Sequence, residues 1–290
     1  MNLIDIASWQ HGIDLATLFK TNPLDGVVVK ATQGTQYVNP DFAGWVKWLA
    51  DHDKPFGFYH YCDGGNAEAE AEHFYRTVKA YIGNGIPVAD YEGQALLKGT
   101  AWLKRFLDRF YALSGVRGMI YCSLSVVREQ PFDALTNHPL WLAQYADMST
   151  VYGFKENPWQ KGSVAPFDSY VMHQYTSCGR LNGYNSNLDF DKFYGSYALW
   201  LELARGEAQP TPAPAPAPTL KPADPSVVLD VLKNKYGIGQ DRVNALRKAG
   251  YDPASVQSAV NRVYGIAQKV KQDIGKDMDY INSILWIARS

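Results

Sequence analysis

The chain has 290 residues, of which 46% are hydrophobic and 13% aromatic, and its formal net charge is −1. That length is enough for one large domain and a smaller one, and the near-neutral charge does not indicate a nucleic-acid-binding protein. No apolar run approaches the length of a membrane span, so we expect no membrane insertion. Three cysteines cannot form a complete disulfide framework, and the N-terminus lacks a signal-peptide pattern, which predicts synthesis in the cytoplasm.

Short apolar runs alternate with helical patterns through the first 200 residues or so. We expect strands at residues 3–6, 26–30, 56–61, 86–89, 118–122, 140–143, 170–174 and 187–190, and helices at 13–20, 42–51, 67–82, 101–113 and 192–204. Alternation of this kind predicts an α/β fold with parallel strands and right-handed crossovers. Eight such strands predict a closed barrel that lacks helices in its second half.

The segment from residue 86 to residue 92, IPVADYE, places two carboxyl groups where a buried strand ends. Side chains two residues apart on a strand point the same way, about 6.6 Å apart along the backbone, so Asp90 and Glu92 should face one side. Burial and mutual repulsion push such pKa values apart, so one group can act as an acid while the other stays ionised. A solvated junction between strand and loop is the alternative interpretation.

Polar and aromatic residues gather at the ends of the predicted strands, where a barrel of parallel strands holds its site. These residues are Asp5, Trp9, Lys30, Tyr59, His60, Asp90, Glu92, Tyr121, Trp141, Tyr145, Gln174, Tyr175 and Asp189. Converging carboxyl groups suit either glycosidic bond hydrolysis or a divalent metal site. The aromatic residues favour glycan chemistry, because their faces pack on sugar rings. No His-rich ligand motif is present, so we expect no metal and no cofactor.

Residues 207–224 alternate proline with small residues, which is typical of an extended, semi-rigid linker. We therefore predict a barrel domain at 1–206, a linker at 207–224 and a small all-α helical bundle at 225–290. Helices are expected at about 226–235, 241–248 and 253–263, and one long final helix over 266–289 is an alternative.

The order of the motifs resembles that of glycoside hydrolase family 25 lysozymes. Residues 5–10 (DIASWQ) are similar to the opening D-x-S-x-x-Q of the family, and residues 30–34 (KATQG) to K-A-T-E-G, with Gln33 where glutamate is usual. Matching segments follow in order at 57–61, 90–92, 120–123, 141–143, 174–176 and 188–189. The resemblance covers about residues 1–200.

This resemblance implies an N-acetylmuramidase that cuts the β-1,4 bond after N-acetylmuramic acid in bacterial peptidoglycan, on a flattened TIM-like (β/α)5(β)3 barrel. It implies that Glu92 is the general acid, Asp90 its partner, and Asp5 and Asp189 supporting acids. It also implies substrate contacts by Trp9, Lys30, Tyr59, His60, Tyr121, Trp141, Tyr145 and Gln174. The carboxyl spacing leaves retaining and inverting outcomes open, and we hypothesise retention assisted by the substrate's acetamido group.

Residues 226–263 resemble the three-helix cell-wall-binding repeat of some phage lysozymes, which implies wall contacts by Arg242 and Tyr251. Residues 264–290 resemble nothing familiar; their apolar side chains could dock on the bundle or form an oligomer contact. Together the resemblances imply a phage-type endolysin, made in the host cytoplasm and released at lysis through a separate membrane pore (a holin). The alternative is a non-catalytic peptidoglycan-binding protein on the same fold.

Overall fold

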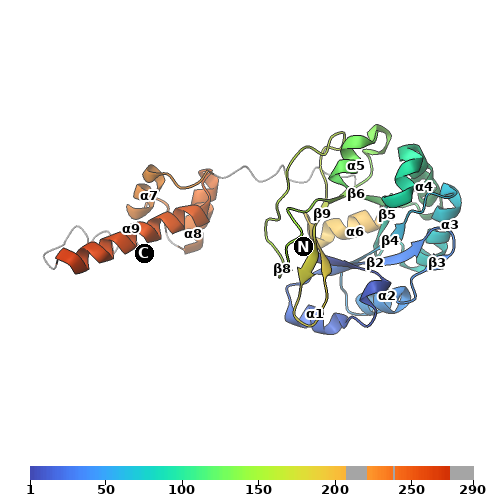
Figure 1. Cartoon of the computed structure of the whole chain (residues 1–290), viewed down its shortest axis with the longest axis horizontal. Helices are drawn as coiled ribbons and strands as arrows, with labels where there is room; N and C mark the ends of the chain where they lie inside the picture. The colour runs from blue at the N-terminus through green and yellow to red at the C-terminus, as the bar shows by residue number, and fades with distance from the viewer. Residues whose placement is uncertain (207–220, 238, 275–290) are drawn as a thin grey trace. The chain divides into compact units, whose positions relative to one another are not determined.

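The computed structural model describes residues 1–206, 221–237 and 239–274 (Figure 1). The chain divides into two compact units, residues 1–214 and residues 215–290, and each has its own hydrophobic core. This division falls inside the proline-rich segment. The domain boundaries at 206 and 224 remain a prediction, because residues 207–220 lie outside the described ranges.

Within residues 1–206, eight strands close into a ring, which confirms the predicted barrel. The ring consists, in order, of β1 (Asn2–Ile6), β2 (Gly26–Gln33), β4 (Phe56–Tyr61), β5 (Ile86–Asp90), β6 (Met119–Ser123), β7 (Leu140–Ala143), β9 (Met172–Arg180) and β10 (Leu188–Phe193). Two short strands lie off the ring: β3 (Tyr37–Val38) pairs with β2, and β8 (Val151–Tyr152) pairs with β9.

The prediction that all the barrel strands are parallel is wrong at β10. This strand pairs antiparallel with both β9 and β1, whereas the ring pairs from β1 through β9 are parallel. Only residues 181–187 separate β9 from β10. A parallel crossover needs a dozen or more residues, so this connection can only reverse the chain.

Helices cover the outside of the first half of the ring (Figure 1). They are α1 (Leu15–Thr21), α2 (Phe42–Asp51), α3 (Ala67–Val78), α4 (Gly99–Ser114) and α5 (Leu124–Glu129), with 3-10 turns η1 (Ser8–Gln10), η2 (Lys79–Tyr81), η3 (Gly93–Lys98) and η4 (Asp133–Leu135). The short helix α5 was not predicted, although the Ser123 side chain caps it by accepting from the backbone N–H of Val126.

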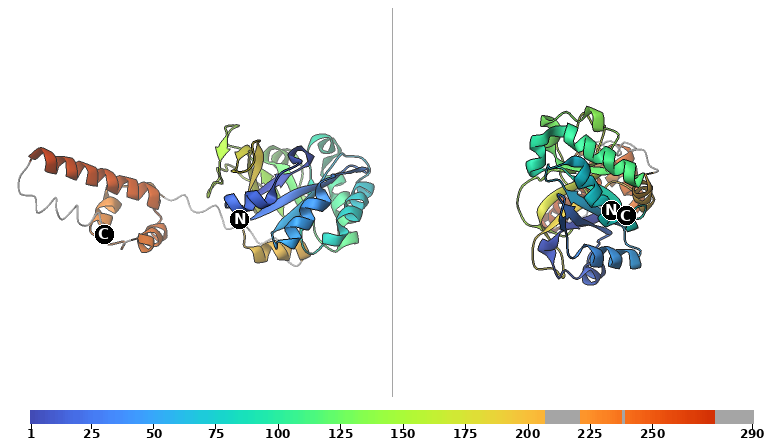
Figure 2. Two further views of the ribbon diagram at one scale, coloured as in Figure 1. Left: turned by 90° about the horizontal axis from the view of Figure 1, so that it is seen from below. Right: turned by 90° about the vertical axis from the view of Figure 1, so that its right-hand side faces the viewer.

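The barrel interior is apolar at one end and polar at the other. Buried side chains from several strands pack inside the first end: Leu3, Val28, Ile86, Val88, Met119 and Phe193. Helix α6 (Tyr197–Arg205) lies across this end (Figure 2), and its Trp200 donates from Nε1 to the carbonyl oxygen of Phe56 at 3.1 Å. Along each strand, every second side chain points into the barrel. Because apolar side chains fill the first end, the inward-pointing positions that remain open lie at the other end, where the parallel strands have their C-terminal ends.

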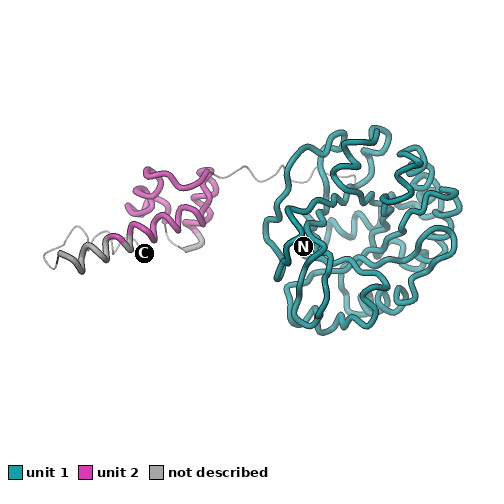
Figure 3. Tube along the Cα trace, viewed as in Figure 1, with its two compact units in different colours: residues 1–214 teal, residues 215–290 magenta. Residues whose placement is uncertain are grey.

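The second unit (magenta in Figure 3) contains α7 (Pro225–Leu232), α8 (Gly239–Lys248) and α9 (Pro253–Ile274) within its described residues. Asp224 caps α7 by accepting from the backbone N–H groups of Ser226 and Val227. Helix α9 continues well past residue 263, where we expected a helix to end. The apolar residues predicted to dock or to form an oligomer contact lie beyond Ile274, outside the described residues. Among the helices that the structure describes, none is both long and apolar enough to span a bilayer.

Candidate active site

A cavity of about 310 Å³ opens at the C-terminal ends of the parallel strands. It is lined by Asp5, Ala7, Trp9, Lys30, Tyr59, Tyr61, Asp90, Glu92, Tyr121, Trp141, Tyr145, Gln174 and Asp189. The structure therefore brings together all the predicted catalytic residues and all the predicted substrate contacts except His60. Sequence reasoning did not select Ala7 or Tyr61, although Tyr61 follows the same alternation as Tyr59.

Strand β5 positions both members of the central carboxyl pair. It ends at Asp90, and the backbone of Glu92 is still extended, with φ −149° and ψ −172°. The strand alternation therefore persists past the last paired residue, and both carboxyl groups reach the cavity. Gly93 then turns the chain with φ +56°. A Cβ atom at that position would lie 2.6 Å from the Tyr61 hydroxyl, which is too close for any other residue without rearrangement.

The two carboxyl groups of the pair differ in their surroundings. Asp90 is buried, and no donor among the described residues reaches its Oδ1 atom. Burial, followed by repulsion from Glu92, raises the pKa of Asp90 well above its ordinary value. Glu92 is less buried; desolvation raises its pKa, while the nearby charge of Lys30 lowers it. Both groups can therefore hold a proton at a higher pH than an exposed acid.

Lys30 is the single cationic side chain among the described residues that line the cavity. Its Nζ atom donates to Gln33 Oε1 at 2.7 Å and lies 4.6 Å from the ring centroid of Tyr61. Gln33 in turn donates from Nε2 to Asp63 Oδ1 at 2.9 Å. A neutral amide thus orients the ammonium group, whose charge interacts with Asp90, Asp63 and Glu92, while burial lowers the pKa of Lys30.

Asp5 and Asp189 lie opposite each other on β1 and β10. Asp5 Oδ2 accepts a 2.7 Å hydrogen bond from Gln174 Nε2. Gln174 Oε1 accepts from the hydroxyl groups of Tyr121 at 2.7 Å and Tyr145 at 2.6 Å. Burial, followed by repulsion from Glu92, raises the pKa of Asp189 to about 6. Asp5 and Asp189 thus belong to a cluster of acidic side chains, and the hydrogen-bond donors around Asp5, namely Gln174 and the two tyrosines, are neutral.

Asp191 is a further carboxylate of this region that the sequence analysis missed. It lies on the same strand as Asp189, two residues along, and accepts a 2.9 Å hydrogen bond at Oδ1 from Trp141 Nε1. The alternation D-x-D was a usable signal, because it has the same spacing as the pair on β5.

Across the described ranges, no three His, Cys, Asp or Glu side chains are grouped so as to hold a metal ion.

The prediction that His60 contacts substrate is wrong. His60 alternates with Tyr59 and Tyr61 on β4, so it points out of the barrel and is 0% exposed. Its Nδ1 lies 2.8 Å from Thr32 Oγ1, and its Nε2 lies 3.1 Å from Glu70 Oε2. The ring packs between strand and helices as a hydrogen-bonded structural residue.

The aromatic side chains at the cavity differ in exposure. Trp9, on η1, is 90% exposed and offers a free indole face beside the cavity. Trp141 also borders the cavity but is buried in the barrel core, and its Nε1 donates to Asp191. Trp9 is thus the better placed of the two to stack on a sugar ring.

In the second unit the two predicted wall contacts, Arg242 and Tyr251, differ in how much of each side chain is exposed. Arg242 is only 8% exposed, and its Nε donates to the Gly237 carbonyl oxygen at 2.8 Å. It therefore holds the connection between α7 and α8 and presents little surface for the predicted wall contact. Tyr251 is half-buried and donates its hydroxyl to Asp224 Oδ2 at 3.1 Å.

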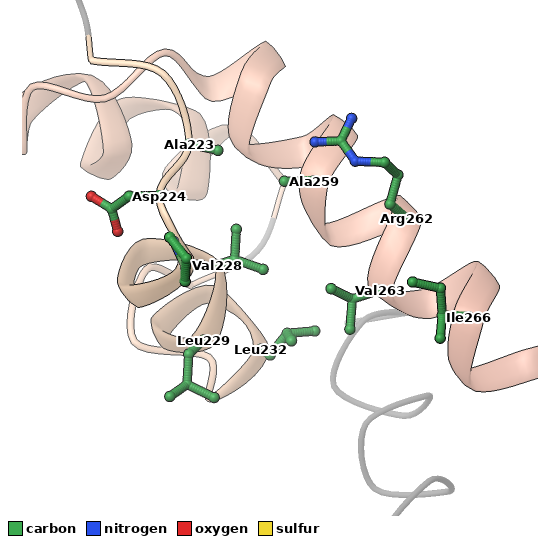
Figure 4. Close-up of a pocket in the computed structure, with 10 residues that line it drawn as sticks. Ala223, Asp224, Val228, Leu229, Leu232, Ala259, Arg262, Val263 and Ile266 are labelled. Carbon is green, nitrogen blue, oxygen red and sulfur yellow. The ribbon is translucent and has the colours of Figure 1, made fainter. Parts of the chain in front are cut away.

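An apolar groove of about 590 Å³ lies between α7 and α9 in the second unit (Figure 4). Its lining includes Leu229, Leu232, Val263 and Ile266, with Asp224 and Arg262 as its charged members. Leu229 and Ile266 are exposed, which leaves apolar surface open to a ligand.

Comparison with known protein families gives two matches along the chain. The model of Glycosyl hydrolases family 25 matches residues 4–184, and the model of the CW_7 repeat matches residues 226–263. The first match covers most of the barrel and includes three of the four predicted catalytic carboxylates, Asp5, Asp90 and Glu92; Asp189 lies beyond it.

Individual relatives agree with these matches. The lysozyme of Streptococcus phage Cp-7 is 27% identical over 277 residues, which cover 90% of this chain and 69% of that protein. The autolytic lysozyme of Clostridium acetobutylicum is 26% identical over 196 residues, which cover 67% of this chain and 56% of that protein. This chain thus spans little more than half the length of the clostridial relative.

Solved structures share the barrel. The catalytic domain of endolysin ply40, from bacteriophage P40 of Listeria monocytogenes, aligns with a TM-score of 0.58 and 25% identity, covering 71% of this chain and 97% of its own. A bacterial lysozyme from Streptomyces coelicolor aligns with a TM-score of 0.56 and 21% identity, covering 72% and 98%. The length of the family match decides the assignment: the chain belongs to glycosyl hydrolases family 25 and carries a CW_7 repeat in its second unit.

Proposed function

We propose that this chain is a phage-type endolysin, a muramidase that hydrolyses the β-1,4 bond between N-acetylmuramic acid and N-acetylglucosamine in bacterial peptidoglycan. The observation that carries the proposal is the convergence of Asp90 and Glu92 in one aromatic-lined cavity of a family 25 barrel. The CW_7 repeat and the similarity to the Cp-7 lysozyme support action on the cell wall.

Glu92 is the general acid in this proposal. It is the less buried member of the pair, so its carboxyl group can approach the glycosidic oxygen of a polymer lying across the cavity mouth. Desolvation raises its pKa, which favours the protonated form that can donate a proton to the leaving oxygen. The charge of Lys30 limits this rise in the pKa of Glu92.

Asp90 stabilises the positive charge that develops on the sugar ring, or orients the acetamido group that attacks the anomeric carbon. A carboxyl in a desolvated position responds strongly to such charge. Asp5 and Asp189 support the pair, and the substrate contacts are Trp9, Lys30, Tyr59, Tyr121, Trp141, Tyr145 and Gln174.

We propose net retention with acetamido assistance. An NMR time course should then show the β-anomer as the first product, and an initial α-anomer would contradict this route.

The second unit binds the cell wall and raises the local concentration of the barrel on its substrate. We propose that the groove between α7 and α9 and the adjoining Tyr251 contribute to this binding, since Arg242 is largely enclosed. The protein is made in the host cytoplasm and reaches the wall at lysis through a holin.

Product analysis tests the proposed activity directly. Purified peptidoglycan would be digested with the full chain, reduced with borohydride and analysed by mass spectrometry. Reduced muramic acid at the new chain ends is the expected result. New reduced glucosamine ends would indicate cleavage of the other glycosidic bond, and intact glycan with bound protein would indicate a non-catalytic binding protein.

A further inference from the structure

We propose that Asp191 is a neutral carboxylic acid that donates a hydrogen bond to Asp5, and that it thereby acts as a positioning residue for the hydrolysis. This inference rests on the proposed function for its catalytic consequence, but the protonation of Asp191 can be measured independently of any activity.

Asp191 lies inside the barrel, where water does not reach it. It is 0% exposed, and only its Oδ1 atom has a donor, the indole N–H of Trp141 at 2.9 Å. In the part of the chain that the structure describes, no N–H or O–H donor reaches Oδ2. An ionised carboxylate with an unpaired buried oxygen is costly, whereas a protonated oxygen can itself donate.

Asp5 lies on β1, which pairs with β10, two residues from Leu3, the register partner of Asp191, so its carboxyl group is the acceptor within reach of Asp191. Two carboxylates cannot pair without a proton between them, so one of the two must donate. Because Gln174 Oε1 already accepts from two tyrosine hydroxyls, its amide nitrogen must be the atom that donates to Asp5 Oδ2 at 2.7 Å. Each of the two carboxyl groups thus accepts one hydrogen bond, but Asp5 lines the cavity, whereas Asp191 does not and is 0% exposed. Ionisation therefore costs less at Asp5, and the proton belongs to Asp191.

The surrounding charges favour the same assignment. Four titratable groups interact electrostatically with Asp191: Asp5 on β1, Asp189 on β10, Tyr145 after β7 and Tyr175 on β9. None of these four groups is a cation. Burial, followed by repulsion from Asp5, raises the pKa of Asp191 well above its ordinary value. The hydrogen bond from Asp191 lowers the pKa of Asp5 against the larger effect of burial.

The consequence for the reaction follows from the charge of Asp5. A negative Asp5 raises the pKa of Asp90, so the proton on Asp191 indirectly influences how the Asp90/Glu92 pair is protonated. The same hydrogen bond fixes the side-chain orientation of Asp5 at the cavity wall. Asp191 itself does not line the cavity and so is not in reach of the substrate.

Two variants of the full chain separate this role from a merely structural one. Asp191→Asn keeps an acceptor for Trp141 and an N–H donor for Asp5, so we expect hydrolysis within about twofold of wild type and an unchanged pH profile. Asp191→Leu is similar in size but removes the donor. We expect its Asp5 to ionise less readily; since a less negative Asp5 raises the pKa of Asp90 less, the limb of the pH–rate profile that Asp90 sets should move to lower pH by about one unit.

Infrared difference spectroscopy at neutral pH gives a readout without substrate. The difference spectrum of wild type minus Asp191→Asn should show a protonated-carboxyl carbonyl band, whether or not peptidoglycan is cleaved. Absence of that difference band would overturn the proposal. So would an Asp191→Asn profile whose acidic limb moves to lower pH, since that shift would mean that a negative charge had been removed. If Asp191→Leu does not fold, the infrared result and the Asp191→Asn profile still decide.

Discussion

Lys30 is the side chain whose charge distinguishes this site from a cluster of acids alone. Its ammonium group lowers the pKa of both Asp90 and Glu92 against the larger effect of burial. Removing the charge should therefore raise both pKa values. Because the charge of Lys30 acts on both groups in the same direction, both limbs of the pH–rate profile should move the same way, whichever member of the pair holds the proton.

We predict that Lys30→Gln shifts the entire profile of kcat to higher pH by roughly one unit. The measurement is initial hydrolysis rate against pH on purified peptidoglycan, with the exposed Lys20→Gln as a matched control. Limbs that stay in place, or that move to lower pH, would show that Lys30 does not act on the carboxyl pair.

Individual residues also show what could be read from the sequence. The pair Asp90 and Glu92 was predicted correctly as cavity-facing, because strand alternation is a local property that extends one residue past β5. His60 was misplaced, although the same alternation on β4 sends it outward between two cavity-facing tyrosines. The hydrogen bond between Trp141 and Asp191 joins residues 50 positions apart, and no local pattern reveals such a partner.

Helix α6 is the element that makes the barrel interior a one-ended cavity. Trp200 is fully buried against Phe193, and its indole N–H satisfies the Phe56 carbonyl group. Substitution here creates a void and leaves a polar atom unpaired.

We expect Trp200→Ala to lower the free energy of unfolding by roughly 3–5 kcal/mol, and Trp200→Phe, which keeps a ring but loses the donor, by roughly 1–2 kcal/mol. Urea denaturation followed by circular dichroism measures both. Equal stability of Trp200→Ala and wild type would mean that α6 does not seal the barrel.

The elements of the barrel were largely predictable, since most strands and helices follow hydrophobic periodicity. The direction of β10 was not, because the rule for alternating strands and helices fails where a short loop leaves no room for a crossover. Helix α9 was predicted to end at about residue 263, but it runs on to Ile274, and its Val256 and Val260 share a hydrophobic core with residues of α7.

At the scale of the whole molecule, the two units each have a separate core, so we expect them to fold and act separately. A truncated chain of residues 1–206 should keep its rate on soluble glycan strands and lose at least about tenfold in affinity for insoluble cell walls. Co-sedimentation with purified walls measures the affinity. Equal wall binding by the truncated and full chains would contradict a binding role for the second unit.

The central claim is that the carboxyl group of Glu92 supplies the proton for glycan cleavage, and turnover of purified peptidoglycan by Glu92→Gln tests it most directly. The control is Glu129→Gln, at an exposed position on α5. We predict that Glu92→Gln lowers kcat by at least about 100-fold, with unchanged circular dichroism and wall binding, while Glu129→Gln cleaves like wild type. A Glu92→Gln variant that cleaves within a few-fold of wild type would contradict the account, since the acid would then lie elsewhere in the cavity.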